Sequence, residues 1–281
     1  MPRTSMLLLV LLVTGLLTTS CAASTETRPD QGARRTDGPV LGADVSWPQC
    51  RRGLGIPQKR SVGAPMPLPR ARFVVVGLTN GPGFTPNPCL ADQVAWVRSR
   101  HLRAAAYAVL SWPDAATVRR HADDGPYDRA RDGGSRLDAL GNTGYQQARF
   151  VLAEMRRAGL PSPIVWLDVE PVPDFAWSRD RQANAAVVRG AARGLTDGGV
   201  AVGAYSTQAL WRDIVGPLRL GVPEWRPAGE TSRAEAVRRC ADDRSFQGGR
   251  GLLAQWLRGG RDHDVTCPGA VADLERLFHQ F

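Results

Sequence analysis

The chain has 281 residues, of which 43% are hydrophobic and 22% are charged, a composition typical of a folded globular protein. The formal net charge is +9, and all but one of the 36 basic residues are arginines, with Lys59 the single lysine. The arginines are scattered and form no basic run interleaved with aromatic residues, which argues against a nucleic-acid surface. The positive charge is instead compatible with adhesion to anionic cell-wall polymers.

The N-terminal segment has the pattern of an export signal. Arg3 and the free amine form a short positive region, and residues 6–17 form an apolar run that is too short to span a bilayer as an ordinary helix. The small residues that follow it, and then Cys21, are similar to a bacterial lipoprotein cleavage site, at which the cysteine becomes the lipidated first residue. Cleavage by an ordinary signal peptidase is the alternative.

Three regions follow from this pattern. We predict a signal peptide with a lipidation site over residues 1–21 and a single folded domain over residues 40–281. Residues 22–39 are rich in Ser, Thr, Arg, Gly and Pro and have no apolar period, so we expect a disordered tether there. The predicted location is extracellular, at the cell envelope, with a lipid anchor at Cys21 as the sole membrane attachment.

Four cysteines remain once Cys21 is set aside, and an even number in an exported chain predicts two disulfides. Three connectivities are possible. Cys50 and Cys89 each follow a predicted strand, and Cys240 and Cys267 flank the last strands, so we favour Cys50 with Cys89 and Cys240 with Cys267. No close cysteine pair or histidine cluster has the spacing of a zinc site.

Strands and helices alternate along the domain, which predicts an α/β fold, namely an irregular (β/α) barrel of the TIM type in a single domain. Pro88 suits a helix start, and Gly159 and Gly198 suit helix ends. The strand-like segments are residues 41–46, 72–78, 104–110, 164–169, 200–205, 223–226 and 252–256, and the clearest helices after the one that starts near Pro88 are residues 145–158 and 182–195.

A long polar stretch, residues 111–144, interrupts this alternation. Long loops without secondary structure are uncommon and are often functional, so we expect it over the same rim of the barrel as Glu170. His121, Asp123 and Asp124 within it are typical of solvated turns, and we predict no metal or other cofactor.

The most informative segment is residues 164–170, an apolar run that ends in two acids spaced two apart. Alternate residues on a strand share a face, so Trp166, Asp168 and Glu170 point one way. Acids on one face are unfavourable unless they are solvated, paired or functional, and barrel enzymes carry their catalytic groups at the carboxyl ends of strands. We therefore predict an active-site pair at the tip of this strand.

Two further acids are expected beside this pair. Asp44 ends the first strand, and Asp264 follows the last strand-like segment, so closure of the barrel brings the two together. Acids around one cleft raise one another's proton affinity, which allows one to stay protonated while another is ionised, as glycoside hydrolysis requires. The aromatic rings that could stack on sugars are those of Trp47, Trp112, Trp177 and Trp211, although for each ring taken alone packing in the core or at the rim is the favoured role.

Several landmarks of the chain resemble those of glycoside hydrolase family 25 lysozymes, in the same order along most of the domain. They are Asp44-Val45-Ser46, Asp168-Val169-Glu170, Gly203-Ala204-Tyr205-Ser206-Thr207 followed by Trp211, and Ala254-Gln255-Trp256 with a terminal Asp. Exported glycoside-hydrolase-like proteins of high-GC Gram-positive bacteria are similar in further strings, namely Asp44 to Cys50, Asn87 to Leu90, Trp166 to Glu170, Phe246 to Gly249 and Asp262 to Cys267.

This resemblance implies a β-1,4 muramidase acting on peptidoglycan, with Glu170 as proton donor. It implies that Asp168 stabilises positive charge or orients the substrate's acetamido group, and that Asp44 and Asp264 complete the acidic floor. The residues expected to contact substrate are Trp47, Tyr205, Gln255 and Trp112. The chain departs from the lysozyme pattern at Thr79-Asn80-Gly81, where an acidic Thr-Glu-Gly is usual, and at Tyr107-Ala108-Val109, where Tyr-His-Phe is usual.

Other functions remain open from the sequence. The main alternative is a non-catalytic lipoprotein that binds a cell-wall glycan through an inherited glycosidase barrel. A separate alternative to a glycan-facing cleft is that Asp168 and Glu170 are structural partners of rim arginines. Nucleic-acid binding is a third hypothesis that the scattered arginines do not favour. We expect a monomer whose partner is peptidoglycan or another wall glycan.

Overall fold

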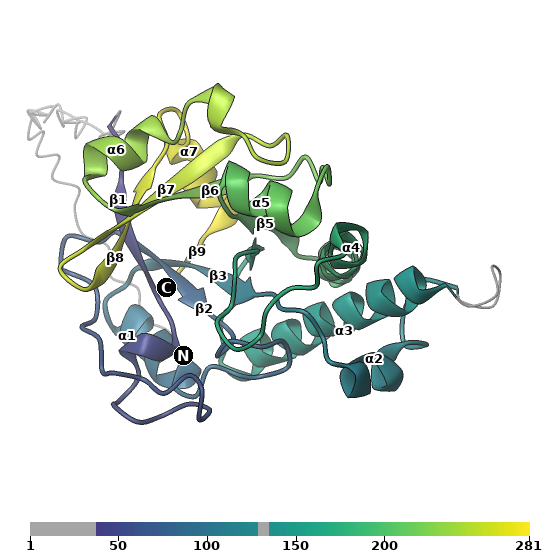
Figure 1. Ribbon diagram of the computed structural model, residues 1–281. Helices are drawn as coiled ribbons and strands as arrows, with labels where there is room; N and C mark the ends of the chain where they lie inside the picture. The colour runs from purple at the N-terminus through teal and green to yellow at the C-terminus, as the bar shows by residue number, and fades with distance from the viewer. Residues whose placement is uncertain (1–37, 129–134) are drawn as a thin grey trace, which may run out of the picture. The chain divides into compact units, whose positions relative to one another are not determined.

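Eight strands close into a barrel in the computed structural model, which describes residues 38–128 and 135–281 (Figure 1). Its residues belong to a single compact unit. The strands are β1 (Leu41–Val45), β2 (Phe73–Gly77), β3 (Arg103–Val109), β4 (Ile164–Asp168), β5 (Ala201–Tyr205), β6 (Glu224–Glu230), β7 (Gly251–Arg258) and β8 (Arg261–Thr266), and a short β9 (His279–Gln280) pairs with β3.

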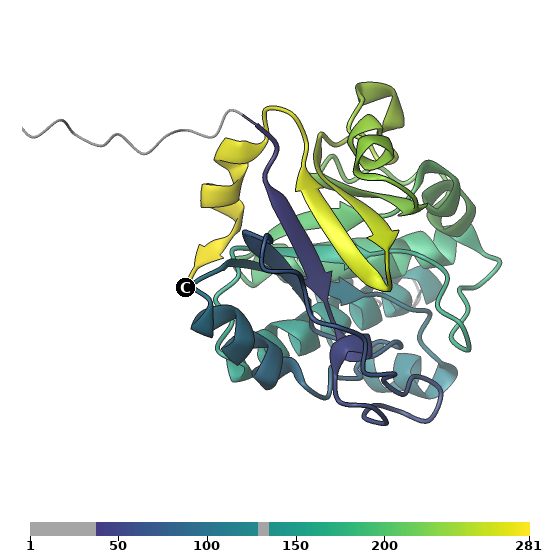
Figure 2. The same ribbon diagram turned by 90° about the vertical axis from the view of Figure 1, so that its left-hand side faces the viewer.

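The barrel is parallel except at one strand. Neighbours from β1 to β7 pair in parallel, whereas β8 pairs antiparallel with both β7 and β1. Figure 2 shows β8 beside β1. A strand that runs against its neighbours has its first residues at the end of the barrel where the other strands finish. The start of β8 therefore lies at the same rim as the carboxyl ends of β1 to β7.

Alternation along each strand separates the barrel interior from its outer surface. In β4, Trp166 packs with Trp225 and Tyr107 from other strands, while Val165 and Leu167 pack in the cluster beneath the helices. Glycines adjust the interior: a Cβ at Gly203 would lie 2.2 Å from the Trp166 ring. The interior is thus filled by large aromatic side chains below the rim.

The helices cover the outside of the barrel (Figure 1). They are α1 (Leu90–Ser99), α2 (Ala115–His121), α3 (Arg136–Arg157), α4 (Arg181–Asp197), α5 (Gln208–Val215), α6 (Arg233–Arg238) and α7 (Val271–Leu277), with 3-10 turns at Trp47–Gln49 and Asp242–Arg244. Helices α3 and α4 pack closely, because a Cβ at Gly190 would lie 1.9 Å from the Gly141 carbonyl oxygen. No helix within the described residues is both long enough and apolar enough to cross a bilayer.

The predicted fold class is confirmed, and each of the seven predicted strands is present. Both favoured disulfides form, with Cα–Cα distances of 5.6 Å for Cys50–Cys89 and 5.5 Å for Cys240–Cys267. The signal peptide over residues 1–21, its lipidation site at Cys21 and most of the tether over residues 22–39 lie outside the described residues.

Two expectations about secondary structure were wrong. The Asp262 to Asp264 segment does not follow the last strand but is part of β8. The polar stretch over residues 111–144 is not a loop, because it contains α2 and the first residues of α3. Asn142 explains part of its polarity: this fully buried side chain donates hydrogen bonds to the carbonyl oxygens of Ala122 and Tyr127, at 2.7 and 2.9 Å.

Candidate functional site

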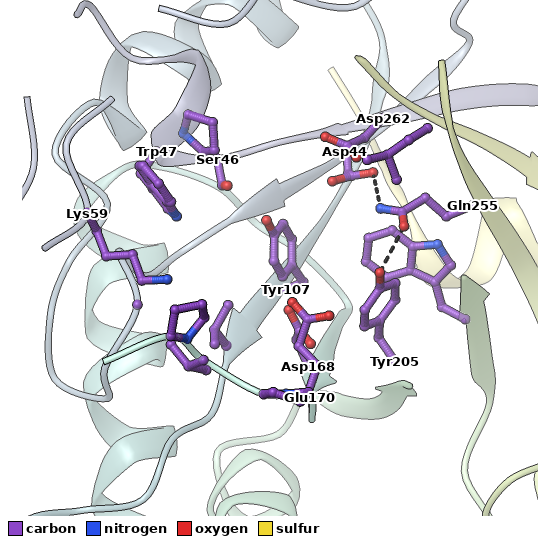
Figure 3. A pocket seen from close by; sticks show the side chains of 18 residues that line it. Asp44, Ser46, Trp47, Lys59, Tyr107, Asp168, Glu170, Tyr205, Gln255 and Asp262 are labelled. Atoms are coloured by element: carbon purple, nitrogen blue, oxygen red, sulfur yellow. Dashed lines mark hydrogen bonds between the residues drawn. The ribbon is translucent and has the colours of Figure 1, made fainter. Parts of the chain in front are cut away.

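An acidic cleft of about 330 Å³ lies at the rim formed by the carboxyl ends of the parallel strands (Figure 3). This is the end of a barrel at which enzymes carry their catalytic groups. The polar and aromatic residues that line the cleft are Asp44, Ser46, Trp47, Lys59, Tyr107, Asp168, Glu170, Tyr205, Trp225, Gln255 and Asp262.

Asp44, near the end of β1, is held by a chain of hydrogen bonds that crosses the cleft wall. Tyr205 donates its hydroxyl proton to Gln255 Oε1 at 2.8 Å, and Gln255 Nε2 donates to Asp44 Oδ2 at 2.8 Å (Figure 3). Burial raises the pKa of Asp44 well above its ordinary value, and the charges of Asp262 and Asp264 raise it further. The Gln255 hydrogen bond acts in the opposite direction. Asp44 therefore tends to keep its proton.

Asp168 and Glu170 lie at the end of β4 and just after it. Asp168 is buried, and its Oδ1 has no hydrogen-bond partner among residues 38–128 and 135–281, whereas Glu170 is partly exposed. The Trp177 indole fixes the turn after β4 by donating to the Glu170 carbonyl oxygen at 2.9 Å.

Both carboxyl groups of this pair hold protons more tightly than usual. Burial raises the pKa of Asp168 well above its ordinary value, and the charge of Glu170 raises it further. Burial also raises the pKa of Glu170, while the positive charge of Lys59 lowers it and the charge of Asp262 raises it. The pair thus loses its first proton at a higher pH than free carboxyl groups do, as a proton donor requires.

Asp262 is a cleft residue that the sequence analysis missed. It is the second residue of β8, at the rim, where burial raises its pKa to about 6. Asp264, which was expected at the cleft, is fully buried two residues deeper along the same strand and does not line it. The Trp225 indole donates to Asp264 Oδ1 at 2.8 Å. The error arose because the segment was expected to follow a strand, whereas it is a strand running back into the barrel.

Tyr107 and Lys59 are two further cleft residues without a predicted role. The Tyr107 ring lies between the Asp44 side and the Asp168 side (Figure 3). Lys59 Nζ lies 5.8 Å from the centre of the Trp47 ring. The sequence did contain a signal for Lys59, because it is the only lysine among 36 basic residues. Of the rings expected to face sugars, Trp47 lines the cleft.

The other three tryptophans that could stack on sugars do not line the cleft. The expectation that Trp112 contacts substrate is therefore corrected. Its ring is partly buried against the Leu140 cluster of α3 and α4, with the Arg136 guanidinium 6.0 Å from the ring centre. Trp177 packs in the same region, and Trp211 is buried with its indole donating to the Leu218 carbonyl oxygen. No described residue between 111 and 144 lines the cleft.

The remaining predicted residues are brought together: Asp44, Trp47, Asp168, Glu170, Tyr205 and Gln255 all line one cavity. Among the described residues, no group of three or more His, Cys, Asp or Glu side chains is arranged to hold a metal ion. Carboxyl groups with raised pKa values, partly exposed at the edge of a cavity, can exchange protons with a bound molecule.

Comparisons with known proteins point to one fold. A family model described as Lysozyme-like protein 1 matches residues 138–246, a range that includes β4 and Glu170. Comparison with the curated proteins gives no match. Among solved structures, a muramidase from Acremonium alcalophilum has 14% sequence identity and a TM-score of 0.51, with 84% of this chain and 96% of that chain covered.

Two other solved structures are also similar. A family GH25 lysozyme from Aspergillus fumigatus has 14% identity and a TM-score of 0.50, with 85% of this chain and 98% of that chain covered. The modular autolysin LytC from Streptococcus pneumoniae has 13% identity and a TM-score of 0.48, with 82% of this chain and 47% of that chain covered. This chain therefore spans about half the length of LytC.

Proposed function

We propose that this chain, which has the barrel fold of glycoside hydrolase family 25 lysozymes, is a muramidase-like enzyme that hydrolyses β-1,4 glycosidic bonds of peptidoglycan. The observation that carries the proposal is the cleft at the carboxyl ends of the strands, in which Asp44, Asp168, Glu170 and Asp262 line one cavity. Paired carboxyl groups in different protonation states are the machinery of most glycoside hydrolases.

Glu170 is the proton donor in this proposal, because it is partly exposed and burial raises its pKa. It donates a proton to the glycosidic oxygen as the bond from that oxygen to the anomeric carbon breaks. Water then supplies a hydroxyl group to the anomeric carbon, and the proton that the water loses returns to Glu170. Both products end in hydroxyl groups, and the enzyme is restored.

The other acids act on the charge of the reacting sugar. Asp262, with a pKa of about 6, is mostly ionised at neutral pH and stabilises the positive charge that develops at the anomeric carbon. Asp168 orients the acetamido group of the reacting sugar from its place in the lining of the cleft. Asp44 completes the acidic floor, held by Gln255.

Aromatic and amide side chains would bind the rest of the glycan. Trp47 offers a partly exposed ring at the edge of the cleft, suited to stacking against the apolar face of a sugar. Tyr205 and Gln255 form the cleft wall and offer polar atoms to sugar hydroxyl groups.

The proposed location is outside the cytoplasm, at the cell envelope. Two disulfides in the described domain support an oxidising compartment. The signal peptide over residues 1–21 and a lipid anchor at Cys21 complete this proposal, with a flexible tether to a monomeric domain that begins near residue 40.

Loss of turbidity of purified cell walls tests the activity. We expect the wild type to clear walls, and Glu170→Gln to lose at least about a hundredfold in rate, because a proton donor typically contributes that much. Glu275→Gln is the matched control, since this exposed residue of α7 lies at the opposite end of the barrel in an ion pair with Arg103. Wall binding without clearing by the wild type would reject the enzyme and leave the non-catalytic binder.

A further inference from the structure

Lys59 is the one basic residue among the described residues that line the cleft, beside four acids. Its side chain extends beside Trp47 into the cavity, on the side away from Asp44 and Asp262 (Figure 3). The ammonium group lies 5.8 Å from the centre of the Trp47 ring. In the described part of the chain it forms no salt bridge with a carboxylate.

The backbone of Lys59 is held by hydrogen bonds. Its N–H donates to the Ile56 carbonyl oxygen at 3.0 Å. The fully buried Asn80 side chain accepts from the Ile56 N–H at 3.0 Å and donates to the Lys59 carbonyl oxygen at 3.2 Å. A carboxylate at position 80 could accept but could not donate, so the amide joins both sides of this turn.

The aliphatic stem of Lys59 is also supported. Gly81 has φ +102°, and a Cβ there would lie 3.2 Å from Lys59 Cγ, so the stem passes close to the backbone. The surrounding segment is tied to the start of α1 by the Cys50–Cys89 disulfide. A lysine whose backbone and stem are both held has lost much of the freedom that exposed lysines keep. Its ammonium group is therefore partly preorganised at the edge of the cleft.

A bound glycan changes the surroundings of this ammonium group. A sugar stacked on Trp47 would displace water beside Lys59 Nζ, and the loss of that water is unfavourable unless an anionic group replaces it. A carboxylate on the glycan would be such a group and would accept a charge-assisted hydrogen bond. The same carboxylate would be repelled by the ionised Asp262 on the other side of the cleft, so Lys59 fixes where along the cleft the charged sugar lies.

We propose, building on the proposed function, that Lys59 binds a carboxylate of the substrate and makes the cleft selective for glycans that carry free carboxylates. Such a carboxylate has two sources in a cell wall. One is a sugar acid group, which is free where the peptide has been removed, and the other is the peptide itself.

Binding rather than turnover is the readout, so that failure of the hydrolase proposal does not affect the test. The Glu170→Gln variant supplies a background in which the glycan stays intact, and its dissociation constant is measured for insoluble glycan by sedimentation. Three substrates are compared: walls with peptides, walls stripped of peptides by an amidase, and stripped walls whose carboxylates have been converted to neutral amides.

We expect amidation of the stripped walls to weaken binding at least about tenfold, a loss typical of one charge-assisted contact. Adding Lys59→Met should weaken binding to the charged stripped walls by a similar factor and leave binding to the amidated walls unchanged. Lys59→Arg should keep most of the affinity. A Lys59 effect confined to walls with peptides would assign the carboxylate to the peptide.

Arg276→Gln is the control for net charge, because it removes one exposed cation from α7 at the far end of the barrel. The proposal is overturned if Lys59→Met weakens binding equally on charged and amidated walls, or if Arg276→Gln matches its effect. Absence of binding to all three substrates also overturns it. Equal urea midpoints for Lys59→Met and its parent would exclude misfolding as the cause.

Discussion

Gln255 Nε2 donates a hydrogen bond of 2.8 Å to Asp44 Oδ2, and this contact joins β7 to β1 across the antiparallel strand β8 between them. The Tyr205 hydroxyl extends the same chain from β5 by donating to Gln255 Oε1. All three side chains are buried. One amide thus aligns side chains from three strands, with its donor directed to the acid and its acceptor to the tyrosine.

Gln255→Leu should weaken both hydrolysis and folding. It leaves Asp44 and Tyr205 without their buried partner, which costs about 1–3 kcal/mol in the free energy of unfolding. Loss of the hydrogen bond also raises the pKa of Asp44, and we expect wall hydrolysis to fall about tenfold or more. Urea unfolding and turbidity clearing are the measurements. Gln280→Leu, which removes an exposed amide from β9, should change neither by a comparable amount.

Asp262→Asn should move the alkaline limb of the activity profile to lower pH. The negative charge of Asp262 raises the pKa of Glu170, so its removal lowers that pKa and deprotonates the donor at lower pH. Lys59→Met should move the same limb to higher pH, because the lysine lowers the pKa of Glu170. Rates of clearing between pH 4 and pH 9 distinguish the two directions. Shifts of the same sign in both variants would contradict this electrostatic account.

The depth of Asp264 predicts how stability depends on pH. Burial raises its pKa well above the ordinary value, and the charge of Asp262 raises it further, whereas the hydrogen bond from Trp225 acts in the opposite direction. A carboxyl group with a raised pKa in the folded state contributes stability at low pH, and this contribution is lost as pH rises through the folded-state pKa. The wild type should therefore lose stability as the pH rises from the ordinary aspartate range toward that raised value.

Asp264→Asn should remove part of that loss. The asparagine keeps an acceptor for the Trp225 indole and cannot ionise, so we expect it to be more stable than the wild type at pH 8 by about 1–3 kcal/mol. The difference should shrink as the pH approaches 4. Urea unfolding at pH 8 and near pH 4 measures the difference in stability between the variant and the wild type. The same difference at both pH values would contradict the prediction.

Asp262 and Asp264 show what could and could not be predicted from the sequence. The predicted strands were recognisable because apolar runs such as that of β4 end in turn residues or acids. β8 begins Arg261, Asp262, His263, so its polar side chains hide the strand pattern, and pairing with β7 and β1 on both sides supplies its stability. Its direction, which decides that Asp262 and not Asp264 reaches the cleft, has no local signal.

The cleft was partly predictable for a similar reason. Alternation along one strand predicts that Asp168 and Glu170 lie at the site, and the position of Asp44 at a strand end predicts the same for that residue. Lys59 lies outside any strand, and its position depends on the Asn80 amide from a segment 21 residues away. Trp112 could not be told from Trp47 by residue type, because packing against α3 and α4 decides which ring stays free.

The two disulfides should have separable effects. They close segments with sequence separations of 39 and 27 residues, so each should stabilise the fold by a similar amount, roughly 3–4 kcal/mol. Cys50–Cys89 ties the segment that carries Lys59 to α1, whereas Cys240–Cys267 joins α6 to the end of β8 away from the cleft. Loss of the first should therefore affect binding as well as stability.

We expect the Cys50→Ala, Cys89→Ala double variant to bind charged stripped walls at least about threefold more weakly, because freeing the segment restores conformational freedom that binding must remove. The Cys240→Ala, Cys267→Ala variant serves as the control and should keep its affinity at temperatures where both variants are folded. Circular dichroism melts establish that temperature, and sedimentation with walls gives the dissociation constants. Equal loss of affinity in both variants would mean that the bridge next to Lys59 has no specific role in preorganising the cleft.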